Sequence, residues 1–220
     1  MKNPTKRIFW ILNAITTGIL GIHSVIVLSP HFLKSELPSF IAGRFNVNGE
    51  ANLPAWYSTI LLFCVSITAY LIYRLSSGIS KKRASWDYLW LWFSIVYLFL
   101  SLDEAAQMHE IFDQLNLEKW IFIYAPLAGL FFLVCLYYFA VIRGKDSALR
   151  NWVIGGLVVY AIGGLVCEWV NYTIPLRYAM KQIEYVAEEG LEMIGTTMVL
   201  TGCLQELNTR FKGVFSRREN

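Results

Sequence analysis

Six carboxylic acids interrupt long apolar stretches of this sequence, at a depth that no lysine or arginine shares. They are Asp103, Glu104, Glu168, Glu188, Glu189 and Glu192. A charged side chain at the centre of a membrane helix costs about 2.5–3.5 kcal/mol on insertion scales, so ionisable residues at this depth indicate a functional site. Six anions held close together cannot all stay ionised. Some must be protonated, or a metal cation or a cationic substrate must lie among them.

A metal ion is the first of these explanations, because carboxylates with one or a few imidazoles are typical ligands of iron, manganese and zinc. The candidate metal ligands are Asp103, His109, Glu168, Glu188 and Glu192. Glu188 and Glu192 are four residues apart, which places two carboxylates on one side of a helix. A bound divalent metal ion would acidify a water molecule. Glu104 or Glu189, not bound to the metal, would then be the catalytic general base.

A simpler interpretation accounts for part of this pattern. Glu184, Glu188 and Glu189 fall in the first turns of a predicted helix, where acidic side chains complement the helix dipole. Asp103 and Glu168 resist this explanation because they lie deep in two other apolar stretches, and Glu192 lies a full turn further along its own. A lone histidine such as His23 is more often an interhelical hydrogen-bonding group than a ligand.

The elements that must position these residues are membrane helices. The chain has 220 residues, of which 56% are hydrophobic and 16% are charged, whereas a soluble domain averages about 45–50% and about 25%. One soluble core of this size cannot bury that surplus. The composition also excludes intrinsic disorder, and a net charge of +3 is too small for a nucleic-acid-binding domain.

A membrane-spanning helix needs about 20 mostly apolar residues. Such stretches occur at about 8–28, 56–75, 88–108, 120–142, 151–172 and 184–206. The sequence therefore predicts an all-α fold, a polytopic bundle of six transmembrane helices that forms a single integral membrane domain over residues 1–220. The outer connection, residues 29–54, would contain an interfacial helix from His31 to Gly43, although Pro38 lies inside it.

The basic residues predict the orientation of the bundle. Fourteen of the 19 lysines and arginines lie in the two terminal segments or in the loops after the second and fourth spans. The positive-inside rule places these segments, and both termini, in the cytoplasm. The protein would then be a multi-pass protein of the cell inner (plasma) membrane, with its acidic residues near the extracytoplasmic side.

Small residues predict where helices approach one another. Gly155-Gly156 and Gly163-Gly164 lie eight residues apart on the fifth span and favour close packing that presses Glu168 into the bundle. The four cysteines form no CxxC pair and are expected to be packing residues.

Three functions are compatible with these features. The first is a metal-assisted hydrolase or transferase that acts on a lipid or lipid-linked substrate from the outer leaflet. The second is a cation or proton-coupled transporter, with Glu104, Glu168 and Glu192 as protonatable relay groups. The third is a non-catalytic subunit of a membrane complex, whose acidic pocket docks a basic helix of its partner. Membrane lipids are the expected partners in the first case.

Overall fold

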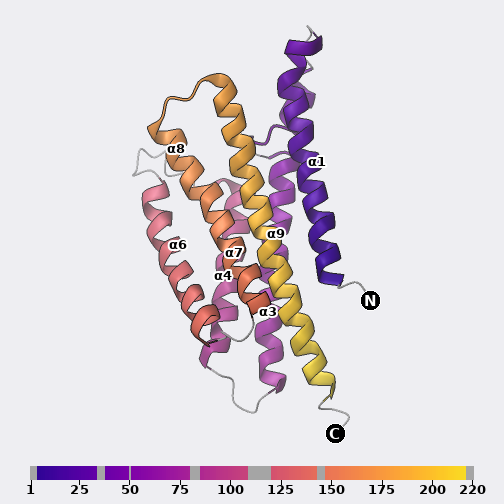
Figure 1. The fold of residues 1–220 in the computed structure, drawn as a ribbon, viewed down its shortest axis with the longest axis vertical. Coiled ribbons are helices and arrows are strands. Elements are labelled where there is room, and N and C mark those ends of the chain that lie inside the picture. The colour runs from indigo at the N-terminus through magenta and orange to yellow at the C-terminus, as the bar shows by residue number, and fades with distance from the viewer. Residues whose placement is uncertain are drawn as a thin grey trace.

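A computed structural model describes residues 4–33, 38–49, 51–79, 85–108, 120–142 and 147–216, and these residues form helices and short connections without a strand (Figure 1). The α-helices are α1 (Pro4–Leu33), α2 (Ser39–Arg44), α3 (Leu53–Ile79), α4 (Tyr88–Ala106), α6 (Trp120–Tyr137), α7 (Ser147–Ala161), α8 (Glu168–Thr173) and α9 (Tyr178–Ser216). A 3₁₀ turn, η1 (Ser85–Asp87), precedes α4, while π-helical segments η2 (Tyr138–Ile142) and η3 (Ile162–Cys167) follow α6 and α7. The predicted all-α fold is confirmed for these residues.

Five helical segments are long and apolar enough to cross a membrane. They are Pro4–Val27, Leu53–Ser76, Tyr88–Ala106, Phe122–Ile142 and Ala148–Asn171. The predicted sixth span, 184–206, lies within α9 and is not among them, because Glu188, Glu189 and Glu192 interrupt its apolar sequence. These five helices support a helical membrane protein.

Helix α9 is central to the arrangement, although it is more polar than its neighbours. It packs against α1, α3, α7 and η3, and α3 packs in turn against α4. Figure 1 shows α9 running between α1 on one side and α7 on the other. We call the end of the bundle where α8 ends and α9 begins the acidic end. We call the opposite end, toward which both chain termini lie in Figure 1, the basic end.

Aromatic side chains fill the core between α4 and η2. Trp90 and Phe93 are almost completely buried, and the Phe93 ring stacks on Tyr97 with ring centroids 5.0 Å apart. Phe139 approaches Trp90 edge-on at 5.8 Å. Offset and edge-to-face pairs of this kind add about 0.5–1.5 kcal/mol beyond the burial of their area. This core holds α4, and with it Asp103 and Glu104, in a defined position.

Glycines let α7 and α9 approach until their backbones touch. A Cβ atom on Gly156 would lie 2.7 Å from the carbonyl oxygen of Gly195, and one on Gly195 would lie 2.5 Å from the backbone nitrogen of Tyr160. Gly202, one heptad after Gly195, faces the side chain of Val153, whose Cγ2 would lie 2.7 Å from an added Cβ atom. The close packing predicted from the glycines of the fifth span is therefore present, and its partner is α9.

The connection between α1 and α3 differs from the predicted single helix from His31 to Gly43. Helix α1 extends to Leu33, residues 34–37 lie outside the described residues, and α2 begins only after Pro38. Pro38 has ψ 133°, an extended conformation. Beyond α2 the chain returns to α1, where the backbone N–H of Val47 donates to Nδ1 of His23 at 3.4 Å. His23 is therefore a hydrogen-bonding group between elements, as the simpler interpretation expects.

Tyr57 holds α1 against α3. Its hydroxyl donates to the carbonyl oxygen of Leu12 at 2.8 Å and accepts from the Thr16 hydroxyl at 3.5 Å. We expect Tyr57→Phe to lower the free energy of unfolding by about 1–2 kcal/mol, because it leaves polar groups of α1 buried without their partner. Thermal unfolding in detergent micelles measures this loss. Tyr178→Phe is the matched control, because Tyr178 is 69% exposed. An equal effect of both substitutions would contradict the assigned role.

Candidate functional site

Asp103 and Glu104 lie in the last turn of α4, at the acidic end. Asp103 is only 8% exposed, and the hydroxyl of Tyr124 on α6 donates to its Oδ1 at 3.4 Å. The helix ends at once, because Gln107 adopts the left-handed conformation with φ 56° and ψ 41°. The Gln107 N–H donates to the Asp103 carbonyl at 2.7 Å, which closes the last turn. Helix α4 therefore ends within one turn of Asp103 and Glu104.

Glu188 and Glu192 lie on the side of α9 that faces η3. A Cβ atom on Gly163 would lie 2.7 Å from the Glu188 carbonyl oxygen, and one on Gly164 would lie 2.5 Å from Oε1 of Glu192. The conflict at Gly163 would be with backbone, so this position requires glycine, whereas at Gly164 the Glu192 carboxyl group would have to move. Pi-helical turns are rare and frequently lie at functional sites. Here the π-helix η3 presents the two glycines to α9.

Three carboxyl groups meet between α8 and α9. Glu168 begins α8, and Glu188 lies within hydrogen-bonding reach of both Glu168 and Glu184. Both carboxyl oxygens of Glu184 are buried, and neither makes a hydrogen bond of good geometry to another described residue. Carboxyl groups at such separations repel one another when ionised, so this arrangement favours sharing protons or binding a cation.

Tyr160 on α7 connects this group to α4. It lies among the charges of Glu192, Glu104 and Asp103. We call the set formed by these acids the carboxyl cluster. Its members are Asp103, Glu104, Glu168, Glu184, Glu188 and Glu192. The cluster draws on α4, α8 and α9, with Tyr124 and Tyr160 from α6 and α7 beside it.

Two further predicted site residues, Glu189 and His109, are not assigned to this cluster. Glu189 is partly buried on α9, about 100° around the helix from Glu188, and its role as a general base stays a prediction. His109 lies outside the described residues, so its part in the site stays a prediction. Within the described ranges, no group of three or more histidine, cysteine, aspartate or glutamate side chains could hold a metal ion. Metal ligation by Asp103, Glu168, Glu188 and Glu192 therefore also stays a prediction.

Sequence reasoning missed three residues of this region. It placed Glu184 in the first turns of a helix, where acids complement the helix dipole, and not in the site, whereas the carboxyl oxygens of Glu184 are buried. It did not single out Tyr124 or Tyr160. A signal for Tyr160 was present, because this residue precedes Gly163 and Gly164 by three and four positions and so shares their side of the helix. Tyr124 carries no comparable signal, because its role depends on how α6 packs against α4.

The five apolar helices and the carboxyl cluster at one end define the class of this protein as a multi-helix membrane protein with an acidic site. Residues 12–207 match the family model described as Domain of unknown function (DUF8692), and the chain belongs to this family. No curated protein matches the chain, and no solved structure matches it either.

Proposed function

We propose that this protein is a membrane enzyme, a hydrolase or transferase that acts on a lipid or lipid-linked substrate at the acidic end of the bundle. The observation that carries the proposal is the meeting of Glu168, Glu184 and Glu188 at the acidic end of the bundle. Carboxyl groups whose environments differ can divide the roles of general acid and general base. Here one protonated carboxyl group would protonate the leaving group, while an ionised neighbour activates water or an acceptor hydroxyl.

The distribution of basic residues supports an orientation for this site. Lysines and arginines are concentrated at the basic end, which we place in the cytoplasm together with both termini. The carboxyl cluster then opens toward the extracytoplasmic side of the plasma membrane. A substrate in the outer leaflet would reach it without crossing the bilayer.

The proposed cofactor is a divalent ion of zinc, iron or manganese. Oxygen ligands from Glu188 and Glu192 on α9, with a nitrogen ligand from His109, which lies outside the described residues, would suit such an ion. Its chemistry would be to lower the pKa of a bound water molecule. Elemental analysis of the detergent-purified protein tests this directly. One metal per chain supports the cofactor, whereas its absence from an active preparation assigns the chemistry to the carboxyl groups alone.

The variant Glu188→Gln tests the catalytic proposal, because it keeps the side-chain shape and removes both the negative charge and the exchangeable proton. We expect it to lower turnover by about 100-fold or more, the usual contribution of general acid–base catalysis. The assay incubates the protein in nanodiscs with a total bacterial polar lipid extract and detects new products by mass spectrometry.

Thr209→Val is the matched control, because Thr209 is an exposed residue of the same helix. Both variants should keep the wild-type melting temperature and elution profile. Unchanged product formation by a folded Glu188→Gln protein would contradict the assignment of this residue.

A cation or proton-coupled transporter is the second candidate, and one observation favours it. Buried polar side chains continue along α9 from the carboxyl cluster toward the basic end, with Thr196, Thr197 and Thr201 at most 1% exposed and Glu206 3% exposed. Each threonine hydroxyl donates to the carbonyl oxygen four residues earlier, so these hydroxyls stabilise their own helix more than they form a continuous chain.

Flux measurements in proteoliposomes separate the two candidates. Proton or cation flux that Glu192→Gln abolishes would favour the transporter over the enzyme. A preparation with neither flux nor turnover, but with a stable protein partner, would favour the third candidate, a non-catalytic subunit.

A further inference from the structure

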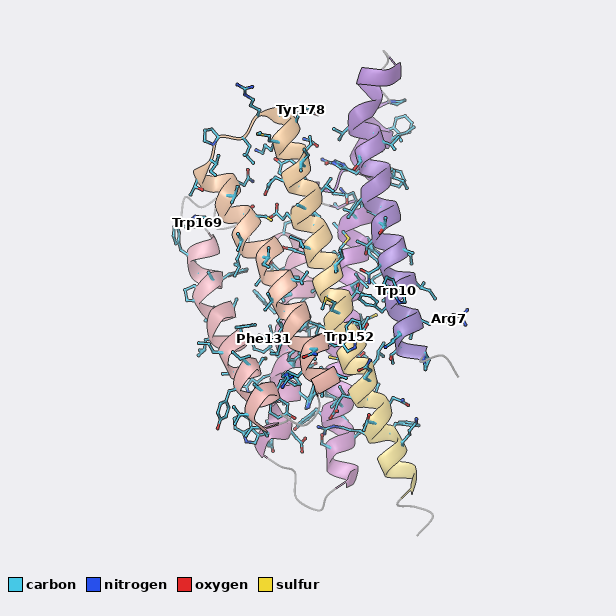
Figure 2. The ribbon with its side chains drawn as sticks, viewed as in Figure 1. Arg7, Trp10, Phe131, Trp152, Trp169 and Tyr178 are labelled. Carbon is cyan, nitrogen blue, oxygen red and sulfur yellow. The ribbon has the colours of Figure 1, made fainter. Side chains whose placement is uncertain are left out.

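An apolar groove runs between α6 and the rod formed by η3 and α8. Its volume is about 370 Å³, and it is lined by Phe122, Ala125, Pro126, Leu165, Val166 and Trp169. Figure 2 shows Trp169 toward the acidic end, beside the start of α6. The Phe122 ring meets the Trp169 ring edge-on with centroids 6.3 Å apart. Ligand pockets begin at about 300 Å³, so the groove has room for part of a lipid.

Each wall of the groove belongs to a helical segment that also carries a residue of, or beside, the carboxyl cluster. On α6, Tyr124 lies between Phe122 and Ala125, and its hydroxyl reaches Asp103. On the opposite wall, Trp169 directly follows Glu168, which meets Glu188. A hydrocarbon chain in the groove would therefore lie against the same two helical segments that carry Tyr124 and Glu168.

The charge of the carboxyl cluster determines which lipid headgroup would bind beside the groove. Glu168, Glu184 and Glu188 are close together, and the buried oxygens of Glu184 have no well-formed hydrogen bond to any other described residue. Lys181 lies close enough to act on the charges of Glu184 and Glu168, but its ammonium group lies over the Tyr185 ring, 5.5 Å from the ring centroid. A ligand ammonium group supplies three hydrogen-bond donors and a positive charge, so it would satisfy the buried Glu184 oxygens. A headgroup whose only charge is a phosphate would be repelled by them.

We propose that the groove binds one hydrocarbon chain of an amine-bearing membrane lipid, whose ammonium group is held by Glu168, Glu184 and Glu188. This inference rests on the proposed function and names the substrate class of that site. The lipid enters sideways from the bilayer, because the groove lies on the outer surface of the bundle. Its headgroup bonds then lie beside the carboxyl groups that carry out the reaction.

Photo-crosslinking tests this proposal with lipids of known composition. The probes are phosphatidylethanolamine and phosphatidylglycerol, each with a diazirine in one acyl chain, at low mole fraction in phosphatidylcholine nanodiscs. We expect phosphatidylethanolamine to label peptides of the groove about fivefold more than phosphatidylglycerol, which corresponds to about 1 kcal/mol of headgroup preference. Glu188→Gln should reduce this preference.

Two tryptophan variants show whether the chain lies in the groove. Ala125→Trp fills the groove and should reduce labelling of its walls about tenfold, because an overfilled site excludes the chain. Leu130→Trp is the matched control, because Leu130 is on the same helix, is 63% exposed and does not line the groove. It should leave the labelling unchanged.

Equal labelling by the two lipids, or labelling spread evenly over the exposed faces of α1 and α6, would overturn the inference. The outcome is separable from that of the proposed function. Selective labelling without any turnover would support the lipid site and contradict the enzyme. Turnover without selective labelling would support the enzyme and contradict the groove as its lipid site.

Discussion

Alanine at Gly195 should push α7 away from α9 and lower the free energy of unfolding by about 2 kcal/mol or more. The added Cβ atom would lie 2.5 Å from the backbone nitrogen of Tyr160 and 2.7 Å from the carbonyl oxygen of Gly156. Neither atom belongs to a flexible side chain, so relief requires the two helices to separate. Separation would also remove the contact between Gly164 and Glu192 and disturb the carboxyl cluster. We therefore expect Gly195→Ala to lose activity together with stability.

Gly129→Ala is the matched control, because it adds the same methyl group at a position without a close neighbour. Gly129 is an exposed residue of α6, and a Cβ atom there would meet nothing within 4 Å. Alanine is a better helix former than glycine by up to about 1 kcal/mol, so this variant should be neutral or slightly more stable. Thermal unfolding in the same detergent compares the two. Equal melting temperatures for Gly195→Ala and Gly129→Ala would contradict a backbone contact between α7 and α9.

Arg210→Met is expected to cost about 3 kcal/mol of stability, because it leaves two carboxylates partly buried without their counter-ion. The Nε of Arg210 donates to Glu206 at 2.7 Å, and its Nη1 donates to Asp87 at 2.9 Å and to the Ser76 hydroxyl. One guanidinium group thus joins α3, η1 and α9 at the basic end. Burial alone would lower the pKa of Arg210, but the neighbouring Glu206 and Asp87 raise it above the usual value. The group therefore stays charged at every pH at which the protein folds.

Lys212→Met removes a positive charge two residues later and is the matched control, because Lys212 is exposed. It should change the melting temperature little, since exposed charges contribute about 0–1 kcal/mol. Arg210→Lys is a second informative variant. One ammonium group cannot reproduce the fork of a guanidinium group, so we expect it to restore only part of the loss. Full stability of Arg210→Met would show that the three segments are held together by their apolar contacts alone.

Much of this architecture could be predicted from local properties of the sequence. An apolar stretch of about 20 residues forms a helix in a membrane because its backbone polar groups have no other partner there. The helices α1, α3, α4 and α6 and the α7–α8 rod followed from this rule. The glycines of the fifth span likewise predicted a close helix crossing, because missing side chains leave room for a neighbouring backbone.

The same rule was less successful for α9. Its predicted span was extended in the structure to residues Tyr178–Ser216, and its acidic residues keep it outside the five apolar segments. A helix surrounded by other helices can be more polar than one that faces lipid, because its polar groups find partners within the bundle. Hydropathy measures the sequence alone and contains no information about those neighbours.

The sequence by itself determined that this protein is helical, that it is suited to a membrane, and that its acids gather near one end. Only the tertiary structure decided which acids meet. It brought Glu184 and Tyr160 into the region of Glu188 and Glu192. The reason is that helix periodicity sets the direction of a side chain only relative to its own helix. The depth and rotation at which α9 crosses η3 follow from the contact of their backbones at the glycines, which is a property of the packed bundle.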